Sequence, residues 1–166
     1  DYKILNIKGT LLDKVQLESY LEKIASDNIL QAKSSKETYP IPRLKENYEI
    51  ITQIYELLTE HIKLKIPIHP AGEWILDNYY IIEEAVKSIV KDITLKKYTN
   101  FPGIATGPYA GFARIYELAG EIVAYTDCKI DGKILPEFLK AYQSKKNLNM
   151  EEIWNIGPFI QIPLIE

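Results

Sequence analysis

Two long stripes of apolar side chains constrain the fold more than any other feature of this sequence. The first runs from Leu44 to Ile62 and the second from Ile75 to Ile93, with steps that alternate between four and three residues. Because an α-helix has about 3.6 residues per turn, this spacing gathers the apolar side chains on one helical face. Short segments rich in Pro and Gly separate these stripes from others with the same period. The sequence therefore predicts an all-α fold.

We expect a single domain over residues 1–166, with about six helices in an orthogonal or bundle-like array. Asp13, with Gln16 three residues later, is a typical start of a helix, and so is Asn149 followed by Glu152. An extended segment (2–11) precedes the first helix, and one longer loop lies near 95–108. The expected helices cover about 13–33, 42–62, 70–93, 109–126 and 135–145, and a last helix after Asn149 bends or stops at Gly157-Pro158.

Charge and composition exclude several classes of function. The net charge of −3, without a basic stripe, argues against binding to nucleic acid. The apolar, uncharged run 154–165 is shorter than the ~20 residues of a membrane-spanning helix. Cys128 is the only cysteine, which fits a reducing, cytoplasmic setting and an inert packed thiol. His61 and His69 lack the spacing of a metal centre, so we expect no metal site and no cofactor.

Glu73 and Asp77 are the candidate catalytic residues. They lie one helical turn apart, with Cβ atoms about 5–6 Å from each other, and could act as acid and base in an enzyme active on glycosides. A carboxylate pair in a glycosidase normally lies on both sides of the substrate, whereas these two share one convex helical face. We therefore favour a solvated face, stabilised near the helix start by the macrodipole, over an active site.

Other polar and aromatic residues suggest structural or binding roles. Asn78 falls within the apolar arc of its helix, so we expect a buried amide that bonds the backbone of a neighbouring element. Tyr98 and Tyr109 fall in the longest loop, where their rings could stack on a sugar. Arg114, Glu117 and Glu121 share one face of a helix, which is typical of surface ion pairs.

The C-terminal tail is too apolar for one amphipathic face. Its prolines, Pro158 and Pro163, interrupt any straight helix, so we expect some apolar side chains to face outward. Exposed apolar patches usually mark interfaces. We accordingly expect Phe159, Ile162 and Ile165 to form a docking surface, either for a module that follows in a longer chain or for a second copy.

Three strings in the chain resemble the N-terminal helical region of the cyclic β-1,2-glucan synthases. They are AGEWILDNYYIIEE (71–84), GPYAGFARIYELAGEIVAYTD (107–127) and EEIWNIGPFIQIPLIE (151–166). The resemblance spans roughly 36–166 and leaves 1–35 without a match. It implies a fragment of a very large protein, in which this region precedes a glycosyltransferase module that uses UDP-glucose. A later module of that family is similar to the glycoside phosphorylases once called glycosyltransferase family 36.

The resemblance implies the function of the parent protein but carries no catalytic residue onto this fragment. We therefore expect a non-catalytic accessory or scaffold domain of a large β-glucan-forming glycosyltransferase. Its partners would be the following modules of the parent, which can associate with a membrane, and β-glucan. Two alternatives stay open: a carbohydrate-binding or protein-docking module that uses the loop 96–109, and a glycoside-active enzyme that uses Glu73 and Asp77.

Overall fold

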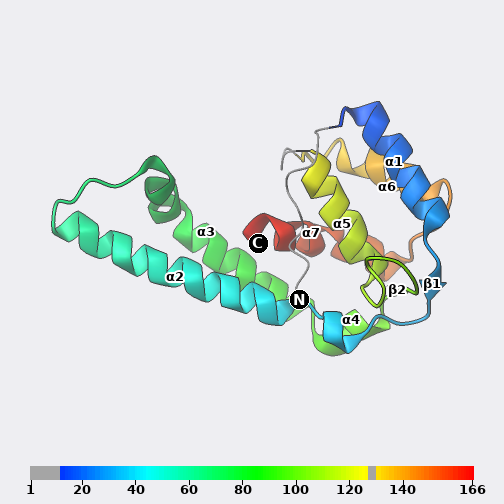
Figure 1. Ribbon diagram of the computed structural model, residues 1–166, viewed down its shortest axis with the longest axis horizontal. Helices are drawn as coiled ribbons and strands as arrows, with labels where there is room; N and C mark the ends of the chain where they lie inside the picture. Colours follow the sequence, from blue (N-terminus) through cyan, green and yellow to red (C-terminus); the bar gives the residue numbers. More distant parts are fainter. Residues whose placement is uncertain (1–11, 127–129) are drawn as a thin grey trace.

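The computed structural model describes residues 12–126 and 130–166, and these ranges contain seven α-helices and one two-stranded sheet (Figure 1). The all-α prediction is confirmed. The expected extended segment at 2–11 and the thiol of Cys128 lie outside the described residues. The elements are α1 (Lys14–Asp27), β1 (Leu30–Gln31), the 3₁₀ turn η1 (Lys36–Thr38), α2 (Ile41–Lys63), α3 (Pro70–Asp92), α4 (Leu95–Asn100), β2 (Gly103–Ile104), α5 (Arg114–Tyr125), α6 (Leu135–Gln143) and α7 (Met150–Ile165).

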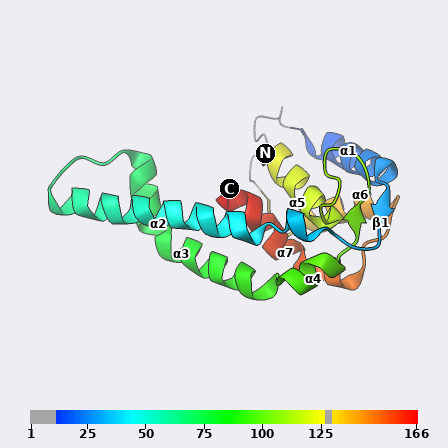
Figure 2. The ribbon, with the colours of Figure 1, turned by 60° about the horizontal axis from the view of Figure 1, so that its bottom comes forward.

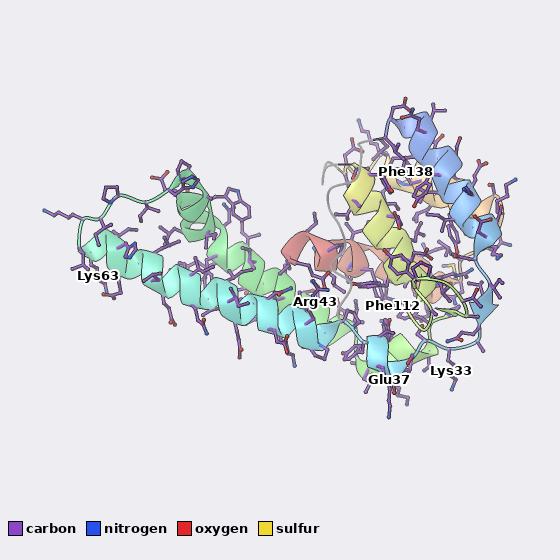
Figure 3. The ribbon with its side chains drawn as sticks, viewed as in Figure 1. Lys33, Glu37, Arg43, Lys63, Phe112 and Phe138 are labelled. Atoms are coloured by element: carbon purple, nitrogen blue, oxygen red, sulfur yellow. The ribbon has the colours of Figure 1, made fainter. Side chains whose placement is uncertain are left out.

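Helices α2 and α3 form a long antiparallel hairpin that projects from a body built by the other helices (Figures 1 and 2). Arg43 lies at the base of this hairpin and Lys63 at its tip (Figure 3). Pro70 occupies the first turn of α3, where its missing N–H costs no hydrogen bond, and the ring of His69 caps that turn. The two apolar stripes predicted from the sequence lie on these two helices.

The core of the body is centred on α5. Helix α7 lies along α5, and α1 lies against α6. On α5, only charged residues and residues near its C-terminal end escape full burial, because the helix is covered on nearly all sides. The strand β1 pairs with β2 in antiparallel register, with Leu30 opposite Ile104. Gly103 lies so close to Lys33 that a Cβ atom there would meet the carbonyl oxygen of Lys33 at 2.6 Å.

Several expected boundaries differ from the structure. Helix α1 ends at Asp27, because Asn28 adopts an extended conformation that leads into β1. The expected loop near 95–108 contains the short helix α4, which Thr94 caps, and strand β2. Helix α5 begins at Arg114 and not near 109, since Gly107 and Gly111 have φ angles of 89° and 87° that an α-helix cannot accommodate.

Helix α7 continues through both of its prolines, from Met150 to Ile165. Of the two expected outcomes at Gly157-Pro158, a bend or a stop, the stop is therefore wrong. Phe159 and Ile162 are fully buried in the core of their own chain, and Ile165 is half-buried against it. The prediction of an exposed docking surface is therefore wrong for Phe159 and Ile162, whereas Ile165 lines an apolar pocket and its role in docking stays a prediction. The physical reason is that α5 and the base of the hairpin cover α7 from several directions.

Candidate functional site

A pocket of about 310 Å³ lies where the end of α1, the turn after β2 and the first half of α5 meet. Figure 1 shows α1 on the side of the body away from the hairpin. We call it the α5 pocket. Its position follows from the left-handed Gly107, which turns the chain back toward α5 and leaves room beside α1. The lining residues include Tyr20, Asp27, Asn28, Tyr109 and Glu117.

Two tyrosine rings from different segments line the α5 pocket. Tyr20 comes from α1, and its hydroxyl donates a hydrogen bond to Oε2 of Glu121 at 3.3 Å. Tyr109 comes from the turn before α5, and its ring packs edge-on against Phe112 with centroids 5.9 Å apart. Both rings are only half-buried, so each keeps part of its surface toward solvent. The pocket therefore combines aromatic surface with carboxyl groups.

Glu117 carries the most perturbed carboxyl of this pocket. Its Oε2 atom is shielded from solvent and has no hydrogen-bond partner among the described residues. Burial, and secondarily the charge of Glu121, raises the pKa of Glu117 to about 7, while hydrogen bonding with Asn28 acts in the opposite direction. Burial also raises the pKa of Glu121, against hydrogen bonds from Tyr20 and Tyr109 that lower it. The two carboxyl groups therefore carry less than two full negative charges at neutral pH.

We expect Glu117→Gln to stabilise the protein at pH 8 by about 1–3 kcal/mol. A carboxyl whose folded pKa is about 7 favours the folded state below its ordinary pKa of 4.5 and loses that advantage as pH rises through 7. Gln mimics the protonated form and has no charge to bury, so variant and wild type should be similar near pH 4. Urea unfolding at pH 4, 6 and 8 measures the difference.

If the difference in unfolding free energy between Glu117→Gln and wild type stays constant from pH 4 to pH 8, the raised pKa of Glu117 is contradicted. Glu37→Gln provides a control of opposite sign. A hydrogen bond from Ser35 lowers the pKa of the exposed Glu37 carboxyl, so the native interaction is present above the ordinary pKa and is lost as pH falls. The Glu37→Gln variant should therefore not gain stability relative to wild type as pH rises.

Glu73 and Asp77 lie near the tip of the hairpin, and both are exposed on α3. They line a second pocket, of about 430 Å³, whose other lining residues are all apolar: Ile62, Ile66, Ile68 and Leu76. No acidic residue from another element lines this pocket. The structure therefore brings the two carboxylates to one side of a pocket, without an opposing acid across it.

The two tyrosines expected to bind sugar have different environments. Tyr98 is fully buried; its hydroxyl lies 2.8 Å from Oγ1 of Thr38 and accepts a hydrogen bond from the backbone N–H of Ala113 at 3.1 Å. It cannot stack on a sugar, so this prediction is wrong. The reason is that its segment forms α4 and packs inward. Tyr109 lines the α5 pocket, and its binding role stays a prediction.

Asn78 is half-exposed, and its amide donates a hydrogen bond at 2.8 Å to the carbonyl oxygen of Trp74, one turn earlier on the same helix. The prediction that Asn78 is buried and bonds a neighbouring element is therefore wrong. The physical reason is that α3 belongs to a projecting hairpin. Only the stripe that faces α2 or the body is buried there, and residues beside that stripe, such as Trp74, are left open.

Arg114, Glu117 and Glu121 do not form surface ion pairs, contrary to the sequence interpretation. Arg114 is buried, and its guanidinium binds the carboxylate of Glu152 on α7 through two hydrogen bonds, Nε to Oε2 at 2.8 Å and Nη2 to Oε1 at 2.7 Å. The sequence reasoning missed this pair and the α5 pocket. The sequence could have indicated that α5 is buried. Apart from Arg114, Glu117 and Glu121, all residues of α5 are apolar, aromatic or glycine, which is typical of a helix covered on all sides.

Across residues 12–126 and 130–166, no group of three or more His, Cys, Asp or Glu side chains could hold a metal ion. In the same ranges, no helix combines the length and the apolar character required to cross a lipid bilayer.

No protein-family model matches the chain. Over 124 residues the chain is 26% identical to the cyclic β-(1,2)-glucan synthase NdvB of Rhizobium meliloti (strain 1021). This match covers 75% of the chain but only 4% of the length of NdvB. It supports a distant relationship between the chain and the cyclic β-(1,2)-glucan synthases, in line with the resemblance seen in the sequence.

Proposed function

We propose that the chain is a non-catalytic helical accessory domain of a large β-glucan-forming glycosyltransferase. The observation that carries this proposal is the similarity to a cyclic β-(1,2)-glucan synthase, of which the matched segment is only 4%. A segment this short leaves most of such a protein to supply the chemistry. The role of this domain would then be to hold or orient other parts of the protein.

The arrangement of the acidic residues supports a non-catalytic role. Glu73 and Asp77 come from consecutive turns of α3, and Glu117 and Glu121 come from consecutive turns of α5. Glycoside hydrolysis normally needs two carboxyl groups about 5–9.5 Å apart that flank the scissile bond from opposite sides. Neither pair has this arrangement, because the members of each pair project from the same side of one helix.

The hairpin supports a scaffold role. Between α2, α3 and the end of α7 lies an apolar pocket of about 390 Å³, lined by residues such as Trp74, Ile82 and Leu164. Trp74 is 59% exposed, and further apolar side chains are exposed along both helices of the hairpin. Apolar surface of this kind is typical of contact sites between proteins or domains. We assign it to contact with another module of the same parent protein.

We expect the purified chain to show no turnover of UDP-glucose or of a β-1,2-glucan. Release of UDP, phosphorolysis and new reducing ends should all stay at the background of a buffer control, because neither of the two acid pairs described above could flank a scissile bond. Parallel assays of Glu73→Gln and Asp77→Asn should give the same background. Turnover that Glu73→Gln abolishes would instead establish the enzyme alternative.

A second function, carbohydrate binding, is supported by one specific observation. The α5 pocket joins two half-exposed tyrosine rings to a carboxyl group with an unsatisfied oxygen. Aromatic rings offer a flat apolar surface to the C–H face of a sugar, and carboxyl groups accept hydrogen bonds from its hydroxyls. Binding through this pocket is compatible with an accessory role and does not require catalysis.

A further inference from the structure

We propose that the α5 pocket binds a glucose unit of a neutral β-glucan chain. The choice of glucan as ligand rests on the proposed function, whereas the position of the site and its preference for a neutral polyhydroxyl ligand rest on the geometry alone. The site differs from the hairpin surface assigned above to contact with another module, because the two pockets share no lining residue.

The size and the walls of the α5 pocket fit a single sugar ring. Its volume of about 310 Å³ lies at the lower end of the range of about 300–1,000 Å³ for small-molecule sites. Tyr20 and Tyr109 line the pocket from different segments and supply aromatic surface, while Ile24 and Ile104 add aliphatic surface. A sugar ring has apolar C–H faces and a polar edge, so such walls can cover a face while leaving the edge free.

Polar groups of the pocket match the hydroxyl edge of a sugar. The Oε2 atom of Glu117 has no hydrogen-bond partner among the described residues, and an unsatisfied, solvent-shielded carboxyl oxygen costs free energy. Glu117 lines the pocket, so a hydroxyl group that enters can donate to this carboxyl after a rotation of the side chain that turns Oε2 toward the pocket. The buried amide of Asn28 donates to the hydroxyl of Tyr142 at 3.1 Å and so holds the adjoining wall in place.

The charges around the pocket select against an anionic ligand. Asp27 and Glu117 line it, and Glu121 lies one turn after Glu117, while Lys23 is the lining cation. A phosphate or nucleotide diphosphate would meet these acids and find Lys23 as the single cation among the described lining residues. A neutral polyhydroxyl compound avoids this repulsion and still uses the hydrogen-bonding capacity of the carboxyl groups.

The test is an NMR titration of the ¹⁵N-labelled chain with sophorose, the β-1,2-linked glucose disaccharide. We expect saturable amide shifts confined to the turn 106–109, to Asn28 and to the turn of α5 that contains Glu117. Tyr109→Ala should weaken binding about tenfold, which corresponds to 1.4 kcal/mol. The matched control is Tyr80→Ala, because Tyr80 is equally aromatic and is 68% exposed on the hairpin; it should bind like wild type.

Thr106→Trp keeps the test decisive if Tyr109→Ala perturbs the fold. Thr106 is exposed at the rim of the pocket, so a large ring there should block entry without removing a core contact. Absence of saturable shifts, shifts that map to the hairpin, or equal weakening by Tyr80→Ala would each overturn the proposal. Tighter binding of glucose 1-phosphate than of sophorose would overturn the preference for a neutral ligand. None of these results bears on catalysis, which the turnover assay tests separately.

Discussion

Replacing Arg114 by Met is expected to lower the free energy of unfolding by about 3–5 kcal/mol. The substitution removes the counterion that Arg114 gives to the fully buried carboxylate of Glu152, and a buried charge without a partner is strongly destabilising. It also removes the hydrogen bond from Nη2 to the carbonyl oxygen of Asn147 at 2.8 Å. Guanidinium chloride or urea denaturation, read by circular dichroism, measures the loss.

The double variant Arg114→Met/Glu152→Leu separates the lost charge from the lost packing. It removes both charges, so it should be clearly more stable than Arg114→Met alone, even though Glu152 also caps α7 through the backbone N–H of Asn149. A loss below about 1 kcal/mol in the single variant would mean that the pair behaves like an exposed ion pair. Equal losses in the single and double variants would mean that the carboxylate tolerates burial alone.

Phe159→Ala is expected to destabilise the protein by about 3–5 kcal/mol, the range for truncation of a buried aromatic side chain. Phe159 is fully buried, and its ring meets Phe101 edge-on with centroids 5.6 Å apart and Tyr98 with centroids 6.4 Å apart. The substitution leaves a cavity where α4, the segment after it and α7 meet. Chemical denaturation of the purified variant measures this effect.

Trp154→Ala on the same helix is the matched control. Trp154 is 67% exposed, so its removal should change stability by less than about 1 kcal/mol. If Trp154→Ala destabilised the protein more than Phe159→Ala did, the orientation of α7 would be wrong. The hypothesis of a C-terminal docking surface formed by Phe159 and Ile162 would then regain support.

Local signals predicted the helices well where they were strong. The two helices of the hairpin were predictable because their stripes are long and because Pro70 marks the start of α3. Asp13 and Asn149 were correct as N-caps, and both form complete capping boxes with the residue three positions later. Helix α4 was missed because its six residues are too few to establish a period.

The candidate site was less predictable, because a period identifies the residues that share a face but not the element that covers it. Arg114 and Glu117 were expected at a solvated surface, yet α7 reaches Arg114 and the α5 pocket encloses Glu117. The prediction that Tyr98 binds sugar was wrong for the same reason, because α4 packs its ring into the core. In each case a residue distant in sequence decided the environment, and no local pattern encodes that contact.

The hairpin also has a mechanical consequence. Helices α2 and α3 have 23 residues each, which corresponds to about 34 Å of length at a rise of 1.5 Å per residue. A rotation of about 10° at the base near Arg43 would therefore displace the tip near Lys63 by about 6 Å. Because of this length, a small rotation where α2 and α3 meet α7 would produce a large displacement at the tip of the hairpin.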